Sequence, residues 1–208
     1  MAMSDARAEI LGRIRAALAD RPSPGEVPWQ YGRAVGTGDQ DVVERFCARV
    51  ADYRAQVERV AEADVAAAVT AALRGAGRVV ADDAVRAAWP DAAPWVRDTG
   101  LTAPELDDVD AVVTTATVAI ANTGTLVLDH GAGQGRRALS LVPDRHVCVV
   151  RTAQIVDDVP EAVARLMESG VHTRPLTWIS GPSATSDIEL NRVEGVHGPR
   201  TLHVIVVG

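Results

Sequence analysis

Four glycine-containing segments with hydroxyl, arginine or histidine side chains occur in the second half of the chain. The first is Asn122-Thr123-Gly124-Thr125, which comes directly before the apolar run 126–128. Two threonine hydroxyls around a glycine can present side-chain and backbone donors to a carboxylate or a phosphate. The same residues also suit a tight turn whose hydroxyls only cap the backbone, and both interpretations stay open.

The second segment reads Asp-His-Gly-Ala-Gly-Gln-Gly and ends in Arg136 and Arg137. Its glycines allow the backbone to approach an anion closely, and arginine offers a two-pronged donor that fits carboxylates. The glycine spacing is not that of a dinucleotide-binding loop. One arginine is expected to pair with Asp129 or Asp144, which leaves Gly135 and Arg136 as the candidates for anion binding.

The third segment, residues 179–189, places Ser180, Gly181 and Ser183 between an apolar run and a predicted helix start. Ser186 and Glu189 have the spacing of a capping box, so the loop would offer free backbone N–H groups at a helix N-terminus. The alternative is that these hydroxyls only cap the helix. A catalytic serine is not indicated, because the segment lacks the G-x-S-x-G pattern.

The fourth segment, residues 195–200, contains His197, Gly198 and Arg200 ahead of the last apolar run. A single histidine in such a loop is more often hydrogen-bonded scaffolding than a proton shuttle. His197 is still the best candidate for a catalytic acid or base, because glycine and proline hold it near the start of a strand.

Composition excludes several kinds of chemistry. All 21 basic residues are arginine, so a pyridoxal Schiff base, a P-loop lysine and a lysine general base are impossible. The net charge of −7 argues against a general nucleic-acid binder. The two cysteines cannot supply the four thiolates of an iron–sulfur cluster, and the histidine spacing predicts no metal site. The sequence shows no secretory signal and no membrane span, which predicts a cytoplasmic protein.

Hydrophobic periodicity predicts an α/β fold with a mainly parallel sheet flanked by helices, preceded by an N-terminal helical extension. Residues 1–38 would form one helix and a Pro/Gly-rich linker, and residues 39–208 the α/β domain. Helices are expected at 4–20, 41–61, 63–73, 83–89 and 160–168, with a helical turn at 136–141 and a short helix after residue 180. Strands are expected at 78–81, 110–115, 125–128, 145–150, 176–180 and 201–207.

In order and spacing, four groups of residues resemble the lactate utilization protein C family. They are Thr123–Leu128, Gly135-Arg136-Arg137, Trp178–Ser183 with Asp187-Ile188-Glu189, and Gly195–Arg200. The resemblance covers residues 110–208 strongly. It implies a LUD domain with a fold similar to the NagB/RpiA/CoA-transferase-like proteins. This fold agrees with the elements predicted above.

The resemblance further implies a role in the oxidation of L-lactate to pyruvate, together with partner proteins that carry the iron–sulfur clusters. The chain itself would hold no cofactor and would bind a small carboxylate or organise the complex. The family often has a glutamate where this sequence has Asn122, which removes a possible base or nucleophile from that loop.

Three functions follow as hypotheses. The first is the accessory subunit of a lactate-oxidising complex, whose anion site is lined by Thr123, Thr125, Arg136, Ser183, His197 and Arg200. The second is a stand-alone CoA-transferase-like or sugar-phosphate-isomerase-like enzyme, against which Asn122 counts. The third is a pure protein-interaction module whose glycine loops are only turns.

Overall fold

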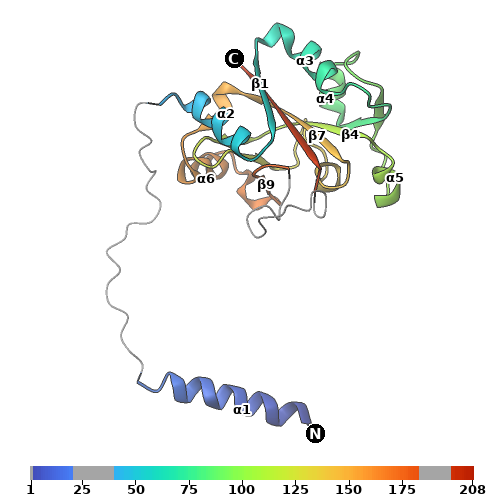
Figure 1. The fold of residues 1–208 in the computed structure, drawn as a ribbon. Coiled ribbons are helices and arrows are strands. Elements are labelled where there is room, and N and C mark those ends of the chain that lie inside the picture. Colours follow the sequence, from blue (N-terminus) through green and yellow to red (C-terminus); the bar gives the residue numbers. More distant parts are fainter. Residues whose placement is uncertain (1, 21–39, 183–197) are drawn as a thin grey trace. The chain divides into compact units, whose positions relative to one another are not determined.

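The structure of the chain is a computed structural model that describes residues 2–20, 40–182 and 198–208. Contacts divide the chain into two units, residues 1–33 and 34–208. In the first unit, helix α1 (Ala2–Ala17) confirms the predicted N-terminal helix (Figure 1). Ile10, Ile14 and Leu18 are exposed and spaced four residues apart, so they lie on one side of the helix path.

The second unit is built on a parallel sheet of six strands in the order β1-β10-β7-β4-β2-β3. The strands are β1 (Gln56–Val60), β2 (Val79–Ala81), β3 (Trp95–Arg97), β4 (Ala111–Thr115), β7 (Arg145–Arg151) and β10 (Thr201–Val207). The central strands are buried on both faces and rich in valine, which is typical of parallel sheets covered by helices. The predicted parallel sheet is therefore confirmed.

A second, mixed sheet has the order β8-β5-β6-β9. Its strands are β5 (Val118–Ile120), β6 (Thr125–Leu128), β8 (Ile155–Val156) and β9 (Thr177–Ile179). Strand β6 is antiparallel to both β5 and β9. Because of this arrangement, the β5–β6 turn lies beside the end of β9, and the loop after β6 lies beside the start of β9.

The helices of the second unit cover these two sheets. They are α2 (Val42–Asp52), α3 (Val65–Ala72), α4 (Asp83–Ala88), α5 (Ala103–Asp107) and α6 (Val159–Glu168), with the short 3-10 turns η1 (Glu62–Asp64), η2 (Arg137–Ser140), η3 (Thr152–Gln154) and η4 (Val171–Thr173). None of the helices in the described part of the chain is long and apolar enough to cross a membrane.

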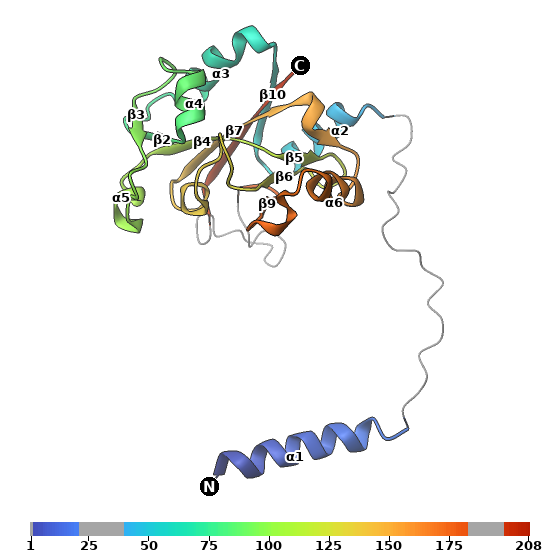
Figure 2. The same ribbon diagram turned by 180° about the vertical axis from the view of Figure 1, so that it is seen from behind.

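Successive residues of the long parallel strands face two different cores. Val147, Val149 and Ile205 pack with α3 and α4, whereas Cys148 and Val204 pack with α2 and the inner face of the small sheet. Helix α6 covers the outer face of the small sheet. Figures 1 and 2 show the result from two sides, with α3 and α4 on one side of the parallel sheet and β9 and α6 on the other.

The fold differs from the prediction in several places. Strand β3 and helix α5 were not expected, and two further differences concern β1 and the small sheet. The helix expected over 41–61 ends at Asp52, and residues 56–60 form β1 instead. Arg54 adopts a positive φ of 62°, which turns the chain out of the helix, and β1 then pairs with β10 at the sheet edge. The small sheet also forms a separate layer that was not predicted, because β5 and β8 are too short to show a period in the sequence.

Candidate anion-binding cavity

A cavity of about 570 Å³ lies between β9, η2 and the first residues of β7 and β10. Its volume is within the usual range for small-molecule sites. Its described lining residues are Arg137, Ser140, Leu141, His146, Leu176, Thr177, Trp178, Ile179, Ser180, Gly181, Pro182, Gly198, Pro199 and Leu202. Three of the predicted ligand-binding residues therefore meet here: Ser180, Gly181 and Gly198.

The predicted hydroxyl residues are joined in a short chain of hydrogen bonds. The Oγ1 atoms of Thr123 and Thr125 are 2.7 Å apart, and Thr125 Oγ1 is 2.7 Å from Ser180 Oγ. Thr125 is buried, Ser180 lines the cavity, and Thr123 lines a smaller cavity of about 370 Å³ beside Arg49 and Tyr53. The first and third predicted segments are thus in contact through the β5–β6 turn and the end of β9.

Two glycines of these segments lie against helix α2. A Cβ atom on Gly124, whose φ is +59°, would lie 2.9 Å from the backbone of Arg49. A Cβ atom on Gly181, whose φ is +81°, would lie 2.8 Å from Cβ of Tyr53. Such distances are too short for a side chain, so both glycines let the loops approach α2 closely. We infer that glycine is needed at both positions because it lets the loops pack against α2 at the edge of the cavity.

Replacing Gly181 by alanine is expected to lower the free energy of unfolding by about 2–4 kcal/mol, because it combines a strained left-handed backbone with overpacking against Tyr53. Gly75 provides a matched control, since it has the same φ of +81° and open space around it. Gly75→Ala is expected to cost only about 1 kcal/mol. Urea unfolding of the two variants checks this difference, and equal losses would contradict the packing role.

The glycine loop after β6 is held mainly by its own residues and by the parallel sheet. Gln134 Oε1 accepts hydrogen bonds from the backbone N–H groups of Asp129 and His130. The N–H of Gly133 donates to Asp82 Oδ1 at 2.9 Å, and its carbonyl accepts from Thr115. These backbone groups are engaged within the protein. The loop therefore positions η2, which follows it, rather than offering Gly133 to an anion.

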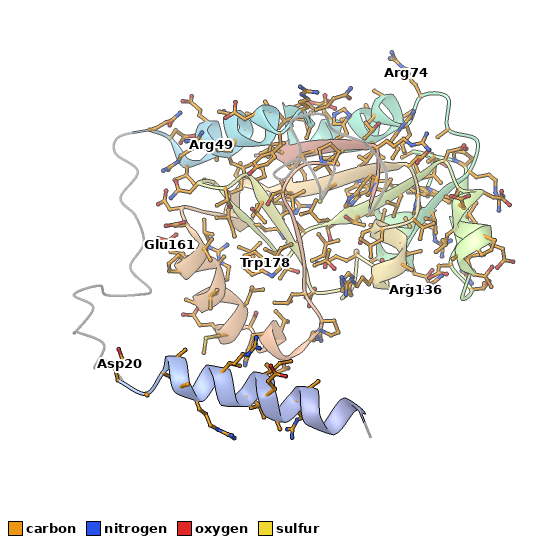
Figure 3. The ribbon with its side chains drawn as sticks, turned by 60° about the horizontal axis from the view of Figure 1, so that its bottom comes forward. Asp20, Arg49, Arg74, Arg136, Glu161 and Trp178 are labelled. Atoms are coloured by element: carbon orange, nitrogen blue, oxygen red, sulfur yellow. The ribbon has the colours of Figure 1, made fainter. Side chains whose placement is uncertain are left out.

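The two neighbouring arginines have different surroundings. Arg136 forms a two-pronged ion pair with Asp98, with Nε to Oδ2 at 2.6 Å and Nη2 to Oδ1 at 3.0 Å. The hydrogen bond from Arg136 holds the pKa of Asp98 below its ordinary value. Figure 3 shows Arg136 at the side of the domain that carries α5, apart from Trp178 on β9. Arg137 instead lines the cavity.

Asp129 and Asp144, one of which was expected to pair with Arg136 or Arg137, form ion pairs with other arginines. Asp129 Oδ2 is 2.7 Å from Arg174 Nη1, and Asp144 is 3.4 Å from Nε of Arg200. Burial raises the pKa of Asp129, but hydrogen bonds from Thr117, Gly131 and Arg174 outweigh it and leave the pKa below its ordinary value. Within the described part of the chain, the side chain of Arg137 forms no hydrogen bond and no ion pair.

The remaining predicted positions are Gly135, Arg200, Ser183 and His197. Gly135, with a φ of +68°, packs against Leu139 of η2, and Arg200 is exposed. Ser183 and His197 lie outside the described residues, as do the predicted capping box and short helix of that region. The acid or base role of His197 therefore stays a prediction.

Sequence reasoning missed His146, which is fully buried in β7 and borders the cavity. Its Nε2 is 2.7 Å from Thr114 Oγ1 on β4, and burial lowers its pKa to about 4. It was overlooked because it belongs to an apolar strand. A histidine directly before the apolar residues 147–150 is nevertheless a signal of a buried polar side chain that needs a hydrogen-bond partner.

The described lining of the cavity has a simple electrostatic character. Arg137 is its charged residue, His146 is neutral at pH 7, and no aspartate or glutamate belongs to the part of the lining that the structure describes. Serine and threonine hydroxyls add donors beside apolar walls. Within the described ranges, no group of three or more histidine, cysteine or acidic residues is placed to hold a metal ion. The arrangement suits a small anion with an apolar part.

Comparison with known proteins places this chain in a family. The family model described as the LUD domain matches residues 33–207. Lactate utilization protein C of Deinococcus radiodurans is 48% identical over 211 residues, which is 99% of this chain and 97% of that protein. The chain belongs to the lactate utilization protein C family.

Other members of the family and a solved structure agree with this assignment. Lactate utilization protein C of a Geobacillus species is 37% identical over 100 residues, which is 46% of this chain and 41% of that protein. The crystal structure of a DUF162 family protein from Deinococcus radiodurans has a TM-score of 0.70 and 46% identity, and covers 80% of this chain and 96% of that one. The resemblance read from residues 110–208 is confirmed.

Proposed function

We propose that this member of the lactate utilization protein C family is the non-redox subunit of an iron–sulfur system that oxidises L-lactate to pyruvate. In this proposal the chain works in the cytoplasm and its cavity binds a small carboxylate. The name of its relative from Deinococcus radiodurans, lactate utilization protein C, supports the lactate role, since the two chains are similar over nearly their full length.

The observation that carries the ligand proposal is the contrast between Arg136 and Arg137. Arg136 is bound to Asp98, whereas Arg137 has no partner among the described residues and borders a cavity of suitable size. A guanidinium binds a carboxylate through two parallel hydrogen bonds, and this pairing is stronger than one between neutral groups. The hydroxyls of Ser140 and Ser180 would provide further polar contacts. The anion site first predicted around Arg136 is therefore proposed at Arg137.

The redox step is assigned to other proteins. Oxidation of lactate to pyruvate removes two electrons, which an iron–sulfur cluster can accept one at a time. A cluster of this type needs about four sulfur ligands. The chain has Cys47 and Cys148, of which Cys148 is buried in the core. We therefore propose that partner proteins of the lactate utilization system carry the clusters.

A likeness to the NagB/RpiA/CoA-transferase-like fold is part of the proposal and is compatible with a cavity at the edge of a parallel sheet. It does not by itself imply transferase chemistry. A transferase of that kind needs a nucleophilic carboxylate, and the corresponding turn has Asn122, whose Oδ1 accepts a hydrogen bond from Arg45. The binding role is favoured for this reason.

Deletion of the gene in the source organism is expected to abolish growth on L-lactate as the carbon source and to leave growth on pyruvate unchanged. The purified chain alone is expected to show no lactate-dependent reduction of an artificial electron acceptor, whereas the chain mixed with its iron–sulfur partners restores it. Growth assays and dye-reduction assays check the two parts. Normal growth of the deletion strain on L-lactate, or turnover by the chain alone, would contradict the proposal.

A further inference from the structure

His130 has an unusual backbone conformation for its residue type. Its φ is 58°, in the left-handed region that glycine favours, and among the described residues other than glycine only Arg54 also has a positive φ. This conformation is unfavourable for a residue with a Cβ atom. Such strain persists only where the surrounding contacts hold the residue, and it is frequent at binding sites. The contacts of His130 therefore indicate what the strained position is for.

The side chain of His130 joins two walls of the cavity. Its Nδ1 is 3.2 Å from the carbonyl oxygen of Gly135, at the end of the glycine loop, and its Nε2 is 2.8 Å from Oγ1 of Thr177 on β9. A carbonyl oxygen can only accept a hydrogen bond, so Nδ1 carries a hydrogen and donates it. Both nitrogens of the imidazole ring are thus engaged, one with each wall.

Strand pairing places the Thr177 hydroxyl on the cavity side of β9. Thr177 lines the cavity and lies directly opposite Leu128 of β6, so the two side chains share one face of the small sheet. Leu128 packs in the inner core together with Cys148 of β7 and Val204 of β10. The bond from His130 to Thr177 therefore lies on the face of β9 that is turned towards the parallel sheet, which is also the side of the cavity.

The other bond reaches the wall that carries Arg137. Gly135 packs against Leu139, since a Cβ atom on Gly135 would lie 2.6 Å from Cδ1 of that side chain. Leu139 is buried and belongs to η2, and Arg137 is the first residue of the same 3-10 turn. The carbonyl group that His130 holds is therefore at the point where η2 is anchored to the glycine loop.

We propose that His130 is a positioning residue of the carboxylate site, which fixes the wall formed by β9 relative to the wall formed by η2. The inference rests on the proposed function. His130 is not among the described lining residues, so it acts through Thr177 and through η2, which carries Arg137. A site whose walls are held before the ligand arrives binds more tightly, because less conformational freedom is lost on binding. The strained φ is the conformation in which one imidazole ring reaches both walls.

Replacement by glycine separates this role from the backbone strain. Glycine relieves the unfavourable φ but removes both hydrogen bonds, so His130→Gly is expected to bind pyruvate at least about fivefold more weakly. Arg54→Gly is the matched control, since it relieves the same strain, at a φ of 62°, in an exposed residue outside the described cavity lining. Its pyruvate affinity is expected to stay within about twofold of the wild type. Isothermal titration calorimetry measures both affinities.

Thr177 tests the bond to β9 separately. Thr177→Val keeps the shape of the side chain without the hydroxyl and is expected to weaken pyruvate binding about threefold and to shift the ¹⁵N resonance of His130 Nε2. Thr177→Ser is expected to restore both. In the wild-type protein, a long-range ¹H–¹⁵N spectrum is expected to show a hydrogen on Nδ1 of His130. An Nδ1 without a hydrogen would overturn the inference.

The results distinguish this inference from the proposed function. If the wild type and His130→Gly bind pyruvate equally well, the inference is overturned and the proposed function stands. If the wild type binds no pyruvate, the proposed function is contradicted and the inference is overturned with it. Where His130→Gly does not fold, the two Thr177 variants decide, and equal binding by Thr177→Val and Thr177→Ser would overturn the inference.

Discussion

Asp157→Asn is expected to lower the free energy of unfolding by about 3–5 kcal/mol, because it leaves a buried arginine without its counter-charge. Arg45 is on α2, and its side chain is only 6% exposed. Its Nη2 lies 2.6 Å from Asp157 Oδ1, and its Nη1 donates to Asn122 Oδ1 at 3.2 Å. The pair joins α2 to the start of α6 and to the β5–β6 turn. Urea unfolding measures the loss.

The two partners of this ion pair differ in exposure, which gives the prediction an internal control. The Asp157 side chain is 36% exposed, so water can solvate its carboxylate when the arginine is removed. Arg45→Met is therefore expected to cost less than Asp157→Asn, at about 1–2 kcal/mol. The double variant is expected to be more stable than Asp157→Asn alone. A larger loss for Arg45→Met would contradict this account of the buried charge.

Arg137→Gln is expected to weaken the binding of pyruvate by at least about tenfold. Hydrogen bonds to charged groups typically contribute about 1.5–3 kcal/mol, and the lower part of this range applies because Arg137, which lines the cavity, is exposed. Glutamine keeps much of the length of the side chain and a donor, but it removes the charge and the two-pronged geometry. Isothermal titration calorimetry at low salt measures the change in Kd.

Arg136→Gln is the matched control, since it is the same substitution one residue away. Its guanidinium is committed to Asp98, so pyruvate binding is expected to stay within about twofold of the wild type. The variant is expected to lose about 0.5–1 kcal/mol of stability, because the pair is partly exposed. A tenfold loss of binding in Arg136→Gln with none in Arg137→Gln would move the anion site back to the residue that the sequence first favoured.

Much of the fold is readable from the sequence because the buried elements carry strong local signals. The strand over residues 201–207 has the predicted bounds, and α6 starts where Asp158 and Pro160 indicate. The error at β1 has a physical cause. Its residues 56–60 continue the helical spacing of apolar residues, and only pairing with β10 makes them a strand.

The site was harder to predict because it depends on contacts between distant residues. Ser180, Gly181 and Gly198, which come from two of the predicted segments, meet in the cavity. The sequence cannot show which of two adjacent arginines is bound by Asp98, since that aspartate is 38 residues away from Arg136. Likewise, the hydrogen-bond partner of His146 is Thr114 on the neighbouring strand, which the sequence alone does not indicate.

A crystal structure of the full chain grown with saturating pyruvate tests the central claim most directly. We expect one pyruvate in the cavity, with its carboxylate oxygens at hydrogen-bond distance from the guanidinium of Arg137. Pyruvate bound at another place on the chain, with Arg137 facing solvent, would contradict the claim that this cavity is the carboxylate site.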